Sequence, residues 1–180
     1  MLKRLPTLGA AVVACLAMTC VTASADGPVS EVRFGVLAHD VALFASNKES
    51  GADINAEIMF ASPDWLGWLG RPRPHLGGSI NTTGDTSAGY FGLTWDTDFA
   101  DSLFFEFGAG GAVHDGKTQT SDPRRKELGC RALFHLSTSL GYRVTERVNL
   151  SVMLDHMSNA SLCDRNESLN NAGLRLGYRF

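Results

Sequence analysis

Apolar and polar residues alternate along most of this chain, in runs of about ten residues separated by turn-forming segments. A period of two is typical of β-strands, because successive side chains point to opposite faces. In one such run, Val148 and Leu150 alternate with Asn149 and Ser151. The pattern predicts eight strands whose apolar faces lie within residues 32–38, 54–60, 76–80, 91–95, 103–113, 132–142, 148–154 and 172–180.

Two kinds of barrel are compatible with these strands. A soluble, lipocalin-like barrel turns its apolar faces inward, whereas an outer-membrane barrel turns them toward lipid. The run length suits a tilted membrane crossing. Glycines on the polar faces, such as Gly108 and Gly141, suit a narrow lumen, and the last strand ends on Phe180. We therefore predict an all-β fold, an eight-stranded antiparallel transmembrane β-barrel of the outer-membrane type, with the soluble barrel as the alternative.

Closure of eight strands predicts that both termini and every second connection lie on the periplasmic side. Trp65 and Trp68 then fall in the longest periplasmic turn, where they fit either an interfacial aromatic belt or an ordinary turn cluster. We expect the outward connections at 39–50, 82–86, 115–129 and 159–170, and the periplasmic ones at 62–73, 97–101 and 143–146.

The first 25 residues have the features of a secretory signal peptide. Lys3 and Arg4 precede an apolar stretch at 8–21, and the small residues at 23–25 form a cleavage site. A retained membrane anchor is the alternative. We predict a cleaved signal peptide at 1–25 and a barrel at 26–180.

Removal of the signal peptide leaves two cysteines, Cys130 and Cys163, in the mature chain. Both fall near the predicted outer rim, and export passes through an oxidising compartment. A disulfide between them and a pair of free thiols are both compatible with the sequence.

Composition excludes several classes of function. The chain has 180 residues, 44% of them hydrophobic and 19% charged, which fits one folded domain. Its formal charge is −3, and loss of Lys3 and Arg4 makes the mature chain more acidic, so we expect no nucleic-acid partner.

The histidines lack the spacing of metal ligands, and we predict no metal. The basic run at 124–126 reads either as a solvated loop or as a contact for lipopolysaccharide phosphates.

Candidate chemistry lies at the outer end of the seventh predicted strand. Its even-numbered apolar face continues into His156 and Ser158, so both side chains project toward lipid or toward the interfacial layer. A histidine beside a serine can act as general base and activate the hydroxyl. Asn170 on the next strand has matching parity, Glu167 is the nearest acid, and Asp155 points the opposite way.

These residues resemble a known family. The motif His156-x-Ser158-Asn159 and the terminal strand ending on Phe180 resemble the lipid A 3-O-deacylase family (PagL-type, also called acyloxyacyl hydrolase). The resemblance is sharp over residues 148–180. It implies an eight-stranded barrel in the outer membrane of a Gram-negative bacterium, with an active site that faces the membrane.

The resemblance also implies catalytic roles. Ser158 would be the nucleophile and His156 the base, while Asn159 and nearby backbone N–H groups would bind the oxyanion. The family has a glutamate fourteen residues after the histidine, where this sequence has Asn170. Three outcomes follow: Asn170 orients His156 as a neutral partner, Glu167 replaces the missing acid, or the enzyme is weakened or inactive.

The leading functional hypothesis is an outer-membrane serine esterase that removes the ester-linked 3-O-acyl chain of lipid A. No cofactor is expected, because serine, imidazole and oxyanion donors suffice for acyl transfer. The expected partners are lipid A, or lipopolysaccharide, and membrane lipid, and a homodimer is left open. The alternative is a non-catalytic barrel with a structural or lipopolysaccharide-binding role.

Overall fold

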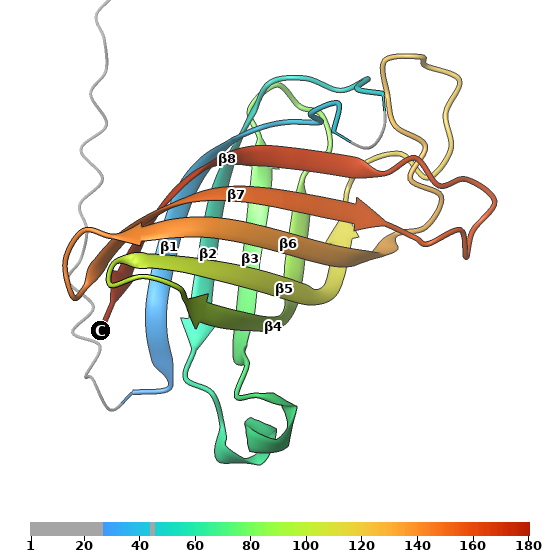
Figure 1. Cartoon of the computed structure of the whole chain (residues 1–180). Helices are drawn as coiled ribbons and strands as arrows, with labels where there is room; N and C mark the ends of the chain where they lie inside the picture. The colour runs from blue at the N-terminus through green and yellow to red at the C-terminus, as the bar shows by residue number, and fades with distance from the viewer. Residues whose placement is uncertain (1–26, 44–45) are drawn as a thin grey trace, which may run out of the picture.

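The structure, a computed structural model, describes residues 27–43 and 46–180. The predicted signal peptide at 1–25 lies outside the described residues. Eight strands and one short helix make up the regular structure (Figure 1). Their bounds are β1 Val29–Ala38, β2 Ala52–Phe60, η1 Asp64–Leu69, β3 Arg73–Asn81, β4 Ala88–Asp98, β5 Leu103–His114, β6 Ala132–Arg143, β7 Val148–Ser158 and β8 Leu169–Arg179.

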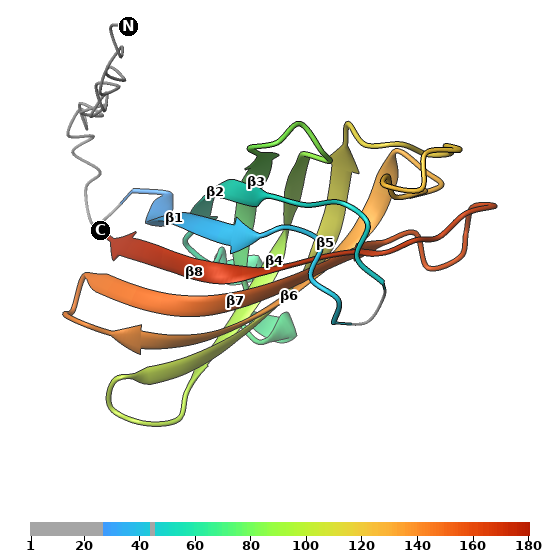
Figure 2. The same ribbon diagram turned by 90° about the horizontal axis from the view of Figure 1, so that it is seen from above.

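The strands form one closed antiparallel barrel, as predicted. Each strand pairs with the next along the chain, and β8 pairs with β1 to complete the ring (Figure 2). The register places Val36 of β1 between Ile54 of β2 and Leu174 of β8, so the apolar parity continues around the wall. Phe180 N–H donates to the Ser30 carbonyl at 3.1 Å, which brings the C-terminus beside the start of β1.

The apolar faces of the strands form the outer surface. Val36 is 56% exposed and Leu174 is 67% exposed, whereas charged residues such as Arg33 and Glu57 are buried in the interior. This is the arrangement of a membrane barrel, whose outer wall contacts lipid. The soluble alternative, with apolar faces inward, is therefore wrong.

Within the described residues, no helix is both long enough and apolar enough to cross a membrane.

Ion pairs fill much of the lumen. Arg33 bonds to Glu31 at 2.8 Å, to Glu57 at 3.2 Å and to Glu106 at 2.5 Å, and Arg175 bonds to Glu57 at 3.0 Å. Buried charges are stable only when paired and hydrogen-bonded. Because four strands, β1, β2, β5 and β8, contribute to this cluster, it ties opposite walls of the barrel together and leaves little open channel.

Glycines on the lumenal face make room for these large side chains. A Cβ atom at Gly141 would overlap the ring of Phe104, and one at Gly177 would overlap Glu31 and Asn149. A narrow eight-stranded lumen cannot hold a large side chain at every inward position. The inward glycines are therefore a packing requirement, which agrees with the sequence expectation.

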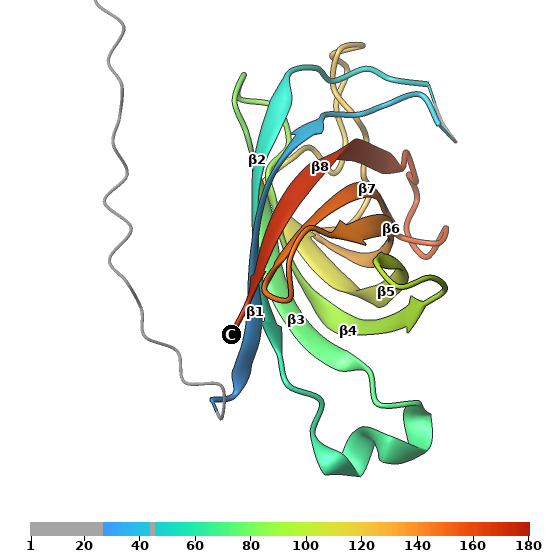
Figure 3. The same ribbon diagram turned by 60° about the vertical axis from the view of Figure 1, so that its left-hand side comes forward.

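One element was not predicted. The periplasmic connection between β2 and β3, expected to be a plain turn, contains the 3₁₀ helix η1, which Figure 3 shows outside the ring of strands. Its sequence, Asp-Trp-Leu-Gly-Trp-Leu, lacks the alternation used to find strands and is too short for a helical period.

Candidate active site

The outer end of β7 carries the candidate nucleophile and base. His156 and Ser158 share the parity of Val152 and Leu154, which are exposed on the lipid-facing wall. Residues two apart on a strand lie side by side on one face. Both polar side chains are half-buried, at the point where the strand leaves the wall and enters the outer loop.

His156 bridges Ser158 and Asn170. Its Nε2 lies 3.0 Å from Ser158 Oγ, and its Nδ1 lies 2.7 Å from Asn170 Oδ1. The second contact follows from the register, because His156 and Asn170 are cross-strand partners on β7 and β8. An amide oxygen only accepts, so Nδ1 carries the proton and Nε2 can accept one from the serine.

Asn170 is held firmly in this position. It is 1% exposed, and its carbonyl accepts a bond from the Val41 N–H at 2.7 Å. Its side-chain Nδ2 has no hydrogen-bond partner within the described ranges 27–43 and 46–180. The amide therefore contacts His156 through its oxygen, while its nitrogen makes no competing hydrogen bond there.

Glu167, the other candidate third member, is directed elsewhere. Its carboxylate pairs with Lys48 at 2.5 Å and accepts the Glu127 N–H at 2.7 Å. Burial opposes charge on this carboxyl, but its hydrogen bonds with Lys48 and Glu127 hold the pKa of Glu167 below its usual range. The structure thus brings Asn170, and not Glu167, into contact with His156.

Asn159 does not have the contacts expected of an oxyanion donor. Its side-chain amide donates to the carbonyls of Leu128 and Arg165, and its own N–H donates to Asn166 Oδ1 at 3.0 Å. The physical reason is parity, since the residue after the outward Ser158 points inward and is buried. In this structure Asn159 joins two outer loops behind the site.

The turn after Ser158 provides other donors. Leu162 N–H bonds to the Asn159 carbonyl at 3.0 Å, and Ala160 and Ser161 between them have φ values of 52° and 63°. Two successive positive φ values closed by this hydrogen bond are the features of a type I′ turn, which non-glycine residues adopt at a cost. In the described part of the chain, the N–H groups of Ala160 and Ser161 make no hydrogen bond. Sequence reasoning missed this turn, because Ala-Ser is not a typical pair for it.

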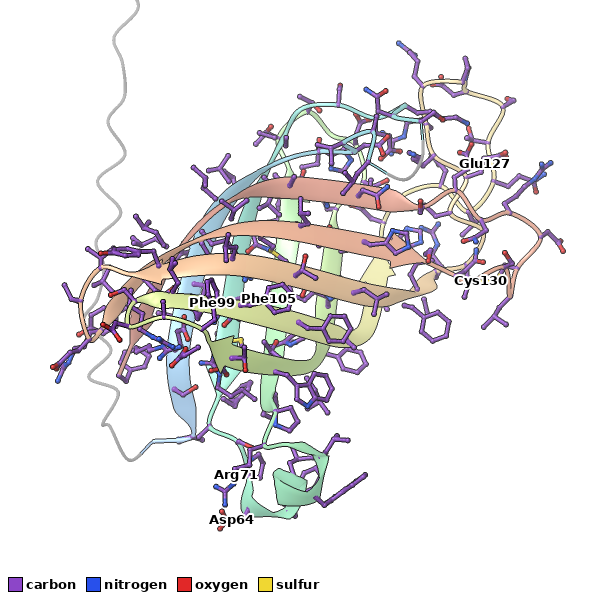
Figure 4. All side chains as sticks on the ribbon, in the orientation of Figure 1. Asp64, Arg71, Phe99, Phe105, Glu127 and Cys130 are labelled. Atoms are coloured by element: carbon purple, nitrogen blue, oxygen red, sulfur yellow. A yellow bond between two sulfur atoms is a disulfide. The ribbon has the colours of Figure 1, made fainter. Side chains whose placement is uncertain are left out.

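Neighbouring loops fix the turn from behind. Cys130 and Cys163 form a disulfide with their Cα atoms 6.1 Å apart, joining the start of β6 to the loop after β7. Gly129, at φ 76°, lies against the Arg165 carbonyl and the Asn159 amide, with no room for a Cβ atom. Figure 4 places Cys130 beside the base of the β7–β8 loop, which Figure 2 shows extending outward.

The basic run at 124–126 differs from both sequence hypotheses. Lys126 is buried and pairs with Asp40 at 3.0 Å, and Arg125 pairs with Asp85 at 2.5 Å. Only Arg124 is a solvated side chain. Two of the three cations therefore hold the outer loops together and are not available to lipopolysaccharide phosphates.

A buried histidine joins the two ends of the connection between β1 and β2. His39, just beyond β1, lies 3.0 Å from Asp53 and 3.2 Å from Glu49. Burial alone would lower the pKa of His39, but its hydrogen bonds with the two carboxylates outweigh this effect and raise the pKa to about 9. Burial would likewise raise the pKa of Glu49, but hydrogen bonds from His39, Thr86 and Lys126 lower it to about 2. The pair is therefore charged near neutral pH.

The possible metal ligands in the described structure are dispersed. Among the described residues, no group of three or more His, Cys, Asp or Glu side chains is arranged to hold a metal ion.

The fold defines a transmembrane β-barrel, and the arrangement of Ser158, His156 and Asn170 is similar to that of a serine esterase site. The chain belongs to the lipid A 3-O-deacylase (PagL) family, whose sequence model matches residues 50–179. This family membership places the barrel in the outer membrane of a Gram-negative bacterium.

One solved structure supports this fold. The chain is similar to the crystal structure of the outer membrane enzyme PagL, with a TM-score of 0.65 and 20% identity over 84% of this chain and 100% of that one. It also matches the solution NMR structure of the de novo designed TMB2.3, at a TM-score of 0.49 and 16% identity over 86% of this chain and 97% of that one. No curated protein sequence matches the chain significantly.

Proposed function

We propose that this protein hydrolyses the ester-linked 3-O-acyl chain of lipid A through an acyl-enzyme on Ser158. The observation that carries the proposal is the bridge of His156 between Ser158 and Asn170 on the lipid-facing wall. A base beside a hydroxyl, held by a third group, is the arrangement that activates a serine. Membership of the deacylase family supports the choice of substrate.

The reaction begins with Ser158 Oγ attacking the acyl carbonyl carbon while its proton moves to His156 Nε2. The tetrahedral intermediate collapses as the bond between the acyl carbon and the 3-oxygen of lipid A breaks. His156 returns the proton to that oxygen, which leaves as a hydroxyl. A water molecule, deprotonated by His156, then attacks the acyl-enzyme carbonyl. The bond between Ser158 Oγ and the acyl carbon breaks, His156 returns the proton to Ser158 Oγ, and a free fatty acid leaves.

Backbone donors of the type I′ turn stabilise the oxyanion in this proposal. The N–H groups of Ala160 and Ser161, two and three residues after the nucleophile, make no hydrogen bond in the described structure. Preorganised N–H donors lower the activation free energy of acyl transfer because they need no reorientation as charge develops. Asn159 has a positioning role, since its amide holds the loops on which the turn rests.

Apolar neighbours on β6 provide a surface for the acyl chain. Phe134 is the cross-strand partner of Ser158, and Leu136 is the partner of His156. Both side chains are exposed on the lipid-facing wall. A lipid substrate can therefore approach from the membrane with its chain along β6 and its ester at the outer rim. The proposal concerns a single barrel, and neither comparison supports the homodimer that the sequence left open.

Replacement of the nucleophile tests this function. We expect mass spectrometry of lipid A from cells expressing the wild-type chain to show loss of one hydroxyacyl group, and Ser158→Ala to abolish that loss. Ser151→Ala is a matched control, because Ser151 lies on the same strand but is buried on the lumenal face. Fully acylated lipid A with the wild-type protein, folded and supplied with substrate, would instead favour a structural or lipopolysaccharide-binding barrel.

A further inference from the structure

The periplasmic helix η1 presents two tryptophans on one face. In a 3₁₀ helix, residues three apart are eclipsed, so Trp65 and Trp68 lie one above the other. Trp65 is 71% exposed and Trp68 is 82% exposed. Two adjacent exposed indoles form an apolar patch that water covers poorly, and such patches mark interaction surfaces.

The next face of the same helix attaches η1 to the barrel. Leu66 is buried and Leu69 is half-buried, again three residues apart. The indole N–H of Trp95, on β4, donates to the Leu69 carbonyl at 2.8 Å. Gly70, which ends the helix at φ 85°, lies against the ring of Trp95. These contacts fix η1 against the barrel.

Trp95, the residue that holds η1 against the barrel, belongs to the lipid-facing wall. Trp95 shares the parity of the exposed Phe91, and its cross-strand partner on β5 is Phe107, with ring centroids 6.2 Å apart. Phe107 is itself exposed on the outer surface. The helix η1, which carries the two tryptophans, therefore lies at the periplasmic end of a wall that already contacts membrane lipid (Figures 1 and 3).

Charged residues mark a separate edge of the segment. Figure 4 shows Asp64, the first residue of η1, and Arg71, just beyond its C-terminal end, near one another on the side of this segment away from the barrel. Both are exposed. An element with indoles on one face and charges at another edge matches the boundary between lipid headgroups and acyl chains, where tryptophan is enriched in membrane proteins.

We propose that η1 binds the phospholipid leaflet on the periplasmic side, with Trp65 and Trp68 inserted at the boundary between headgroups and acyl chains. The ligand is phospholipid, recognised through its interfacial layer. The contact fixes the depth of the barrel from the side opposite the outer rim. It does not depend on the catalytic proposal, because it involves none of the residues at the outer end of β7.

Intrinsic fluorescence tests this directly, because the chain has three tryptophans and all of them belong to η1 or its docking contact. The full-length barrel is folded into phosphatidylcholine vesicles containing lipids brominated either near the headgroup or deep in the chain. We expect Trp95→Phe, which retains Trp65 and Trp68, to emit at shorter wavelength than indole in water. Its emission should be quenched more by the shallow bromolipid than by the deep one.

The double variant Trp65→Phe/Trp68→Phe gives the emission of Trp95 by itself, because it leaves Trp95 as the single tryptophan. Subtracting its emission from that of the wild type gives the η1 signal in an intact docking contact, so the test does not rely on Trp95→Phe alone. The proposal is overturned if that signal is quenched by iodide, present on both sides of the membrane, as strongly as free indole is. Emission shielded from iodide but unaffected by either bromolipid would also overturn it, because the indoles would then be covered by protein and not by lipid.

Discussion

The contact between Asn170 and His156 yields a quantitative prediction about the strength of the candidate triad. Asn170→Asp keeps an oxygen at the position that lies 2.7 Å from His156 Nδ1 and replaces the Nδ2 group, which has no hydrogen-bond partner among the described residues. The substitution therefore changes the charge of the acceptor with little change in shape. We expect Asn170→Asp to increase the rate of lipid A deacylation.

The expected size of this effect follows from hydrogen-bond energetics. A neutral hydrogen bond contributes about 0.5–1.5 kcal/mol net, and one to a charged group about 1.5–3 kcal/mol. The imidazole becomes cationic in the transition state, so the additional 1–1.5 kcal/mol, roughly, lowers the activation free energy by that amount. This corresponds to about a tenfold increase in kcat/KM.

A matched series makes the test specific. Asn170→Leu has nearly the same size but no acceptor, so deacylation should decrease in the order Asp, Asn, Leu at position 170. Glu167→Gln should cost less than Asn170→Leu, because the Glu167 carboxylate contacts Lys48 and not His156. The assay is the time course of fatty acid release from purified lipid A by folded protein in detergent micelles. Equal rates for Asn170→Leu and the wild type would refute the orienting role.

The outer loops lead to three further predictions. Because the raised pKa of His39 and the lowered pKa of Glu49 favour the charged pair, its stabilisation is fully present between pH 4.5 and 6.5 and is lost above about 9 and below about 2. The midpoint temperature of thermal unfolding should therefore fall at both alkaline and acidic pH, and His39→Gln should remove the fall at alkaline pH. Serines at Cys130 and Cys163 should lower the free energy of unfolding in urea by up to roughly 4 kcal/mol, because the disulfide closes a long loop, and an unchanged midpoint would contradict this. Gly129→Ala should slow deacylation while the barrel stays folded, because a Cβ atom there displaces the Arg165 carbonyl and the turn that depends on it. A rate equal to wild type would show that the turn tolerates that displacement.

The barrel was predictable from the sequence because alternation is a local property of the backbone. A strand sends successive side chains to opposite faces whatever it pairs with, so the period-two runs gave the eight strands and their order. The same parity placed His156 and Ser158 together on the outer face and His156 opposite Asn170. The motif around Ser158 then indicated the deacylase family, which the family match confirmed.

The conformation of the loops was not predictable in this way, because no periodicity describes them. Whether Lys126 meets water or Asp40 depends on how two connections, far apart in sequence, pack over the barrel mouth. The same holds for Glu167, whose partner Lys48 lies in a loop more than a hundred residues earlier in the sequence. Such pairs form only once the strands have set the positions of the loops.

The sequence by itself thus determined the strands, their faces and the identity of the candidate catalytic pair. Only the tertiary structure decided between the candidate partners of that pair, with Asn170 and not Glu167 in contact with His156. It also turned Asn159 inward to Leu128 and left the N–H groups of the turn at 160–161 unbonded in the described structure. The physical reason is range. Side-chain direction along a strand depends on adjacent residues, whereas a hydrogen-bond partner in a loop depends on every strand that brings the loops together.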